Sequence, residues 1–284
     1  MRVRRNKLKP LQSCAGVFCL LFTGCASLPG ITFERHSTAD RIAFSGGLQK
    51  SSTAADPFTI ISYYRIQKKG EPLHVYIEGD GLAWLSKEIL SDDPTPMNPL
   101  ALRLAALDPS PNVVYLARPC QYTMDTACDD AYWSGKRFSE PVIRSMNTAV
   151  TDFVARSAAK QVHLMGYSGG GAVAVLIAGR RDDVASIRTI AGDLDPQGLN
   201  RYHKVSPLDG SLDPMDAAVR VSHIPQRHFI GAADKRVPAF VAENFFKAAE
   251  GSSCIQITEV SHAEHAKGWE PEWRGLLDLP VECK

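Results

Sequence analysis

The sequence predicts an α/β protein with a mainly parallel central sheet flanked by helices. Along most of the chain, short apolar runs alternate with longer stretches of helical pattern, which is typical of βαβ units around a parallel sheet. A glycine-rich turn at residues 166–171 connects one apolar run directly to a stretch with the pattern of a helix. With 284 residues, of which 44% are hydrophobic, the chain can bury a sizeable core.

The first strands are expected soon after the N-terminal region. Residues 58–66 and 73–79 have the pattern of two strands, and the sequence KKG at residues 68–70 predicts a turn between them. A third strand is expected at residues 112–116, and a helix near residues 141–158 follows it.

The alternation then continues toward the C-terminus. In chain order we expect a strand at 161–165, a helix near 170–180, strands at 187–191 and 227–230, a helix near 239–249 and a strand at 255–260. Residues 194–225 break this pattern, because they hold four Pro and several Asp residues with weak periodicity. We expect this stretch to be an insertion over one end of the sheet.

The chain begins with the features of an export signal. Five basic residues precede residue 10, no acidic residue precedes Glu34, and residues 11–22 are apolar except for Gln12 and Ser13. An apolar run of this length is too short to span a membrane, which takes roughly 20 residues, but it suits an export signal.

Small residues lead from this run to Cys25 in the segment FTGC, which resembles the signal of a bacterial lipoprotein. The resemblance implies a signal peptide at 1–24, a lipidated tether and irregular segment at 25–57, and a folded domain at 58–284. Because Ala26 is not the Asp associated with inner-membrane retention, we expect the protein at the outer membrane of a bacterial envelope, facing the periplasm. The alternative is a plain secretory signal with an incidental cysteine.

The charge balance argues against a nucleic-acid-binding function. The chain has 32 Lys and Arg against 31 Asp and Glu, which gives a formal net charge of +1. Since the basic residues at the N-terminus leave with the expected signal peptide, the remaining chain is mildly acidic and offers no basic surface. No feature of the sequence predicts a particular oligomeric state.

Four cysteines follow the expected lipid anchor: Cys120, Cys128, Cys254 and Cys283. An even number of cysteines in an oxidising compartment predicts two disulfides. Three pairings are possible, and proximity in the sequence favours Cys120–Cys128 and Cys254–Cys283. None of the four lies in a C-x₂-C pair, so we expect no metal site.

Ser168 is the candidate nucleophile. It lies at the centre of residues 166–170, GYSGG, which fit the pattern G-x-S-x-G between an expected strand and an expected helix. In such a turn the central residue has strained backbone and its neighbours must be small, so the Ser168 hydroxyl would project at the carboxyl edge of the sheet. The alternative is a glycine-rich helix start with Ser168 as its N-cap.

A serine nucleophile needs a base and a group that orients the base. Asp234 lies just after an expected strand in the segment GAADKRVP, which resembles the loop that carries the acid in many α/β hydrolases. Asp193, Asp195 and Asp213 are the competing acids.

Two histidines after the last expected strand are candidates for the base. A spacing of about four residues from the strand end, common in α/β hydrolases, favours His265, whereas the distance from the acid favours His262. We choose His265 as the base and keep His262 as the alternative. Histidines within expected strands (His74, His163 and His228) are interpreted as structural.

The oxyanion of an acyl-transfer reaction also needs hydrogen-bond donors. The backbone N–H of Gly169, directly after the nucleophile, is the first candidate. The segment YIEGDGLAW, residues 76–84, resembles the H-G-x oxyanion loop with Glu78 in the histidine position. That resemblance implies the N–H of Asp80 as the second donor.

Residues 58–278 as a whole resemble a serine hydrolase of the α/β-hydrolase fold, and most closely the bacterial lipoprotein branch of that family. Four segments carry the resemblance: EGDG (78–81), RPCQY (118–122), GYSGGG (166–171) and SPLDGSLDP (206–214). The resemblance implies the fold and hydrolytic chemistry.

We predict a membrane-anchored esterase in which Ser168, His265 and Asp234 cleave a small-molecule or lipid ester through an acyl-enzyme. This chemistry requires no metal or organic cofactor, and we expect neither. One alternative is a thioesterase or amidase that uses the same triad. The other is an inactive envelope lipoprotein that acts as a binding or assembly module, since a fold alone does not fix a function.

Overall fold

An eight-stranded sheet forms the centre of residues 29–284, the part of the chain that the computed structural model describes. In chain order its strands are β1 (Gln49–Ala55), β2 (Phe58–Ile66), β3 (Leu73–Ile77), β4 (Asn112–Leu116), β5 (Val162–Tyr167), β6 (Val184–Ile190), β7 (Gln226–Gly231) and β8 (Ile255–Val260). Their order in the sheet is β1-β2-β4-β3-β5-β6-β7-β8. The pairs on both sides of β2 are antiparallel, and all other neighbouring strands are parallel.

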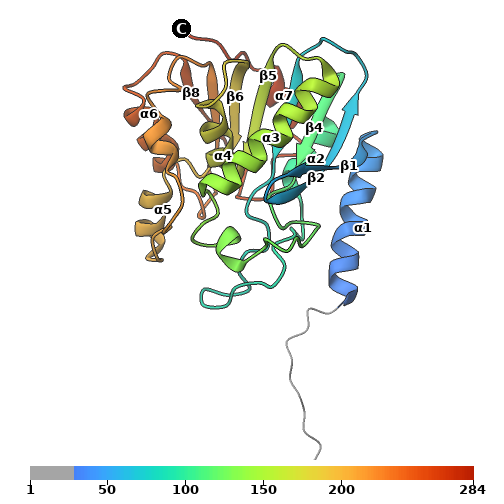
Figure 1. Cartoon of the computed structure of the whole chain (residues 1–284). Coiled ribbons are helices and arrows are strands. Elements are labelled where there is room, and N and C mark those ends of the chain that lie inside the picture. Colours follow the sequence, from blue (N-terminus) through green and yellow to red (C-terminus); the bar gives the residue numbers. More distant parts are fainter. Residues whose placement is uncertain (1–28) are drawn as a thin grey trace, which may run out of the picture.

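Helices cover both faces of the sheet (Figure 1). They are α1 (Pro29–Ser45), α2 (Leu100–Leu107), α3 (Glu140–Ser157), α4 (Gly169–Ala178), α5 (Pro196–His203), α6 (Phe240–Ala248) and α7 (Trp273–Asp278), with short 3₁₀ helices at Asp130–Trp133 and Pro214–Ala217. Residues of α3, α4 and α6 belong to one buried apolar cluster, and residues of α1, α2 and α7 belong to a second. The sheet therefore has an apolar core on each face.

The central strands contribute side chains to both cores, which explains why their sequences read as continuous apolar runs. In β3, for example, Val75 and Ile77 lie in the core under α3 and α4, whereas Tyr76 lies in the core under α2 and α7. All three side chains are fully buried. Successive residues of a strand point to opposite faces, so both faces must be apolar when both are covered.

The strand order creates a switch point at β3. The chain passes from β3 to β4 on one side and then crosses to β5 on the other side of β3. Parallel strands end at the same edge of the sheet, called the carboxyl edge below, and open α/β sheets bind their ligands outside this edge at such a switch point. The loops after β3 and β5 therefore lie where a ligand site is expected.

These observations confirm the predicted fold class, a mainly parallel sheet flanked by helices with an insertion near residues 194–225. The insertion forms α5, the 3₁₀ helix Pro214–Ala217 and loops. His203 at the end of α5 is hydrogen-bonded to the backbone oxygen of Arg236 over 2.7 Å, which joins the insertion to the loop after β7.

The N-terminal part of the chain differs from the prediction of an irregular segment at residues 25–57. Residues 29–45 form α1, and β1 pairs with β2 along its whole length. The small residues that suggested a tether are packed instead, because Ala39 and Ala43 are buried against the sheet. The folded part therefore extends N-terminal to residue 58, whereas the predicted signal peptide 1–24 and Cys25 lie outside the described residues.

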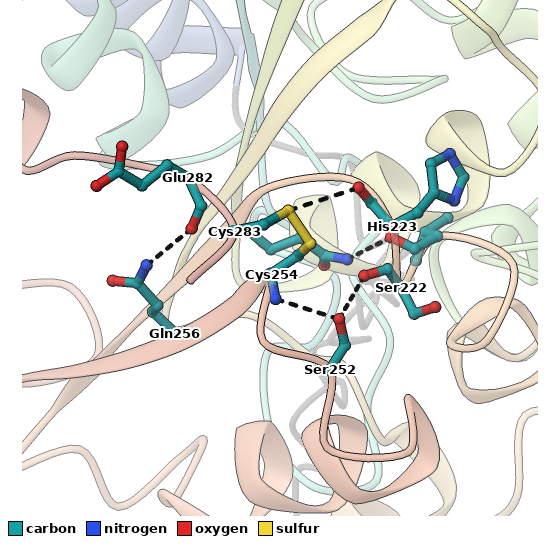
Figure 2. Close-up of a disulfide and its surroundings, with 9 residues drawn as sticks. Ser222, His223, Ser252, Cys254, Gln256, Glu282 and Cys283 are labelled. Atoms are coloured by element: carbon teal, nitrogen blue, oxygen red, sulfur yellow. Dashed lines mark hydrogen bonds between the residues drawn. A yellow bond between two sulfur atoms is a disulfide. The ribbon is translucent and has the colours of Figure 1, made fainter.

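Both expected cysteine pairs lie at disulfide distance: Cys120 with Cys128, and Cys254 with Cys283. The second pair ties the C-terminal tail to the start of β8, beside a hydrogen bond of 3.0 Å from Gln256 Nε2 to the Glu282 carbonyl (Figure 2). In residues 29–284, no helix is both long enough and apolar enough to cross a bilayer.

Candidate active site

Ser168 lies in a sharp turn between β5 and α4. Its backbone has φ 50° and ψ −121°, a conformation that L-residues with side chains rarely adopt and that is typical of strained functional positions. The turn also demands a close approach to β3, because a Cβ on Gly170 would lie 2.3 Å from the carbonyl oxygen of Ile77. Ser168 is thus held at the carboxyl edge, at the positive N-terminal end of α4.

His265 contacts both other members of the candidate triad. Its Nε2 lies 3.1 Å from Ser168 Oγ, and its Nδ1 lies 2.9 Å from Asp234 Oδ2. The indole N–H of Trp269 donates to the backbone oxygens of Glu264 and His265, at 2.8 and 3.2 Å, and so holds the loop after β8. The imidazole therefore joins serine and carboxylate through two different nitrogens.

Asp234 is fixed by the turn that follows β7. Its Oδ1 accepts the backbone N–H groups of Arg236 and Val237, at 2.8 and 3.0 Å. Burial opposes ionisation of this carboxyl, but the hydrogen bond with His265 and these amides outweigh it and hold the pKa of Asp234 below its ordinary value. The carboxylate is therefore charged when it faces His265 at neutral pH.

The competing residues have other partners. His262 is exposed, and Asp193 pairs with Arg137 at 3.1 Å. Asp195 caps α5 through the Gly198 amide and also accepts a hydrogen bond from Asn244. In the same way, Asp213 caps the 3₁₀ helix that follows it. In the described residues, only Asp234 is hydrogen-bonded to the imidazole that contacts Ser168.

The two predicted oxyanion donors lie on loops that touch each other. A Cβ on Gly169 would lie 2.2 Å from Asp80 Oδ1, so the loop after β3 packs directly against the residue after Ser168. Within residues 29–284, neither the Gly169 N–H nor the Asp80 N–H donates a hydrogen bond. Neither amide therefore has an acceptor within the described part of the chain.

Two arginines surround the carboxylate of Asp80. Arg118 Nη1 lies 3.3 Å from Asp80 Oδ1, and Arg137 Nε lies 3.2 Å from Asp80 Oδ2. Arg137 also pairs with the buried Asp193, and both guanidinium groups lie near the Phe138 ring. The sequence analysis assigned no role to Arg118 or Arg137. The position of Arg118 in the sequence could have suggested a role in the site, because it follows β4 by two residues at the carboxyl edge.

Glu78 lies inside the core behind the same loop. Burial raises the pKa of Glu78 to about 7. Its Oε1 accepts the N–H of Gly79 over 2.9 Å, which fixes the backbone immediately before Asp80. Glu78 therefore fixes the loop through the Gly79 amide, while Arg118 and Arg137 hold it through the Asp80 carboxylate.

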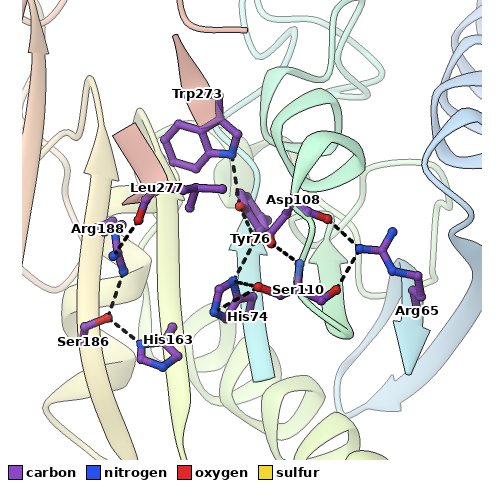
Figure 3. A network of polar contacts seen from close by, with 10 residues as sticks. All are labelled: Arg65, His74, Tyr76, Asp108, Ser110, His163, Ser186, Arg188, Trp273 and Leu277. Carbon is purple, nitrogen blue, oxygen red and sulfur yellow. Dashed lines mark hydrogen bonds and ion pairs between the residues drawn. The ribbon is translucent and has the colours of Figure 1, made fainter. Parts of the chain in front are cut away.

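A second group of Ser, His and Asp side chains lies at the opposite edge of the sheet (Figure 3). His74 Nδ1 is 2.7 Å from Asp108 Oδ2 and 3.0 Å from Ser110 Oγ. Tyr76 donates to the same Asp108 oxygen over 2.7 Å, and Trp273 Nε1 donates to the Tyr76 hydroxyl over 3.1 Å. This group links β3, α7 and the loop before β4, in agreement with a structural role for His74.

The described residues contain no group of three or more His, Cys, Asp or Glu side chains that could hold a metal ion. A pocket of about 330 Å³ lies within the insertion, between α5 and residues 205–213. Ser168, His265 and Asp234 do not line this pocket, so it is separate from the candidate active site.

Comparison with solved structures identifies similar folds. An esterase from Pyrococcus furiosus matches with a TM-score of 0.59 at 10% identity, over 81% of this chain and 90% of that one. An α/β serine hydrolase homologue from Coxiella burnetii matches with a TM-score of 0.53 at 14% identity, over 80% and 93%. The architecture of this chain is thus that of the α/β hydrolases.

A longer protein shares the same fold in part. The acylaminoacyl peptidase of Pyrococcus horikoshii matches with a TM-score of 0.57 at 13% identity, over 77% of this chain and 37% of the peptidase. This chain therefore spans less than half of the peptidase. No protein-family model and no curated protein matches the sequence.

Proposed function

We propose that this chain is a membrane-anchored serine hydrolase that cleaves carboxylic esters through an acyl-enzyme. The observation that carries the proposal is the pair of contacts made by His265, 3.1 Å to Ser168 Oγ and 2.9 Å to Asp234 Oδ2. A serine hydroxyl is a poor nucleophile unless a base takes its proton, and a neighbouring imidazole oriented by a carboxylate is suited to that task.

In the first step, His265 Nε2 accepts the Ser168 proton while Oγ attacks the ester carbonyl. Asp234 holds the proton on Nδ1 and stabilises the imidazolium that forms. Collapse of the tetrahedral intermediate breaks the bond to the alcohol oxygen, and the imidazolium gives its proton to the departing alcohol. The product of this step is the acyl-enzyme on Ser168.

The negative charge of the intermediate is stabilised by the backbone N–H groups of Gly169 and Asp80. The Asp80 carboxylate belongs to the same residue as one of these amides and would repel an oxyanion if it were unpaired. Arg118 and Arg137 lie within 3.3 Å of the Asp80 carboxylate, so the loop can present its amide without a net negative charge beside it.

In the second step, water replaces the alcohol. His265 takes one proton from the water as its oxygen attacks the acyl carbon, and then returns a proton to Ser168 Oγ as the acid leaves. The free enzyme is regenerated, and every proton transfer is made by residues of this chain.

The proposed anchor is lipid attached to Cys25. Its support is the sequence FTGC after a short apolar run, and several acyl chains on one sulfur give stable attachment, at about 0.8 kcal/mol for each buried CH₂. The proposed location is the outer membrane of a bacterial envelope. Metabolic labelling with palmitate should mark the wild-type chain and leave Cys25→Ser unlabelled, and labelling of both would exclude this site.

The test of the hydrolase is covalent labelling with a fluorophosphonate, which reacts only with an activated serine. Wild-type protein should be labelled and Ser168→Ala should not, with circular dichroism as the control for folding. An unlabelled wild type would favour an inactive envelope lipoprotein that acts as a binding or assembly module. Labelling that persists in Ser168→Ala would contradict the choice of nucleophile.

The scissile bond can be assigned with a panel of matched substrates. We expect turnover of an ester to exceed that of the thioester and amide with the same acyl group. The similarity to an acylaminoacyl peptidase makes the amide the second candidate, because the same three side chains also serve amide cleavage.

A further inference from the structure

Apolar side chains are exposed on the loops at the carboxyl edge. Trp84, Leu85, Ile89, Met97 and Met124 are 44, 61, 57, 53 and 52% exposed, and these five residues are called the apolar rim below. They lie on the loops that follow β3 and β4. Isolated apolar residues on a surface are ordinary, but five on the loops that leave one edge of the sheet are typical of an interaction surface.

The most prominent part of the rim is a small hairpin. Trp84 and Leu90 form an antiparallel bridge, and the amide of Leu85 donates to the Ile89 carbonyl over 2.8 Å. The buried Trp133 donates its indole N–H to the carbonyl of Ser91 over 2.9 Å. This hairpin has its own hydrogen bonds and a fixed base, so its apolar tip is held out in solvent.

The start of α1 lies against the same loop. Arg35 Nη1 donates to the backbone oxygens of Asp93 and Thr95, both at 3.1 Å, and the His36 ring packs on Tyr122. Figure 1 shows the N-terminal end of α1 and the loops after β3 and β4 on the same side of the molecule, opposite the C-terminus. The chain therefore enters the fold beside the apolar rim.

The distance from the proposed anchor to this side is short. Cys25 precedes Pro29 by four residues, and a chain of that length spans at most about 14 Å. A bilayer that holds the acyl chains of Cys25 must then lie close to the first turn of α1. The surface that faces it is the one that carries the apolar rim.

From these contacts we infer that the apolar rim docks on the lipid bilayer, with the hairpin around Trp84 and Leu85 in the interfacial layer. This inference rests on the lipid anchor in the proposed function and adds an orientation to it. The hairpin tip also carries the exposed Lys87 and Glu88, whose opposite charges balance. Long charged side chains can keep their ends among the headgroups while their stems lie on apolar groups. The carboxyl edge with Ser168 then faces the membrane, and the substrate class is an acyl ester presented by a bilayer.

The first experiment uses Trp84 as a probe. It is exposed, whereas the other three tryptophans are buried. The lipidated full chain is reconstituted into vesicles of phosphatidylethanolamine and phosphatidylglycerol that contain phosphatidylcholine brominated on its acyl chains. We expect the bromolipid to quench Trp84 emission, Trp84→Phe to remove the quenched component, and the vesicles to protect Trp84 from acrylamide.

Three outcomes would overturn the inference. The first is that the protein floats with the vesicles, but acrylamide quenches Trp84 emission and the bromolipid does not. This result would place the rim in water. Protein that does not float would contradict the Cys25 anchor and the docking together. A dimer in detergent that dissociates in Leu85→Ser/Ile89→Ser would assign the rim to a second copy of the chain.

The second experiment separates docking from catalysis. Leu85→Ser/Ile89→Ser should hydrolyse a soluble short-chain ester at the wild-type rate but a vesicle-embedded ester roughly fivefold or more slowly, because docking is weakened. Val219→Ser, which changes an exposed apolar residue outside the rim, should leave both rates unchanged. Equal slowing of the vesicle-embedded ester by both variants would contradict a specific role of the rim. Failure of the hydrolase proposal would appear separately, as a wild type inactive on both esters.

Discussion

The two Ser–His–Asp groups of this chain lie at opposite edges of one sheet and differ in which imidazole nitrogens they use. At the carboxyl edge, His265 contacts Ser168 through Nε2 and Asp234 through Nδ1. At the other edge, His74 Nδ1 makes the close contacts with both Asp108 and Ser110, at 2.7 and 3.0 Å, and Nε2 lies 3.5 Å from Ser110 Oγ. A relay needs one nitrogen to take the serine proton while the other is held by the acid, so only the first group has the geometry of a catalytic triad.

The two serines also differ in backbone conformation and surroundings. Ser168 has a positive φ in the turn after a buried strand, which exposes its hydroxyl at the end of the sheet. Ser110 lies in the loop before β4, where its amide donates to Asp108 Oδ1 over 2.8 Å and its carbonyl accepts from Arg65. Residue types and short distances are thus common to both groups. What distinguishes the group at Ser168, and supports the proposal of a nucleophile there, is its placement at the carboxyl edge and the separate partners of the two imidazole nitrogens.

The largest expected difference is between the two serines. Ser168→Ala should reduce kcat for a short-chain ester by about 10⁴-fold or more, because nothing else can form the acyl-enzyme, while Ser110→Ala should stay within about twofold of wild type. Steady-state kinetics on both variants checks this. Comparable losses would show that the two groups are not functionally distinct.

Substitution of Asp234 should affect activity, whereas substitution of Asp108 should affect stability. Asp234→Asn should lower kcat by roughly 10²–10⁴-fold, since an amide no longer fixes the productive imidazole tautomer. Asp108→Asn should leave kcat near wild type and lower the free energy of unfolding by about 2 kcal/mol, through the loss of charged hydrogen bonds to His74 and Tyr76. Urea unfolding and ester hydrolysis measure the two effects, and a stable, inactive Asp108→Asn would reverse the assignment.

Acid should lower the stability of the fold through protonation of Asp108, over a defined pH range. Burial works against ionisation of Asp108, but hydrogen bonds with His74, Tyr76 and the Ser110 amide lower its pKa to about 2. A lowered pKa stabilises the fold above the ordinary value near 4, and this contribution is lost as the pH falls from about 4 toward 2. Over that range Asp108→Asn should lose about 2 kcal/mol less stability than wild type. Parallel curves of unfolding free energy against pH would contradict this role.

The smallest effect is expected at the second histidine of the His265 loop. His262 is exposed, so His262→Ala should change kcat by less than about twofold, whereas His265→Ala should resemble Ser168→Ala. The pair forms a matched control because both residues lie in the same loop after β8. A large loss in His262→Ala would revive it as the base.

The sequence was sufficient to predict the parallel core because buried strands leave a strong local signal. The strand at 112–116 and the strand at 255–260 have the predicted bounds, and the turn at Ser168 lies where the glycines place it. The edge elements α1 and β1 were not predicted. Their sequences are polar and small, and they become ordered by pairing with β2 and packing on α2, which are long-range contacts that a local pattern does not contain.

The residues of the candidate site could likewise be predicted only in part from the sequence. Ser168 has a local motif, but the choice between His262 and His265 depends on how the loop after β8 bends, and the Trp269 hydrogen bonds that hold this loop are tertiary contacts. Arg118 and Arg137 reach Asp80 from other loops. Motifs reveal residues that act through their immediate neighbours, whereas the groups that position them come together only in the fold.

The bond between Cys254 and Cys283 turns the segment that carries His265 into a closed ring. The two cysteines are 29 positions apart, and β8, the loop with His265 and α7 all lie between them. A protease that cuts this loop once would therefore leave both fragments covalently joined, and the imidazole could not be carried away with the released end. Only reduction of the sulfur bridge after such a cut would separate His265 from Ser168.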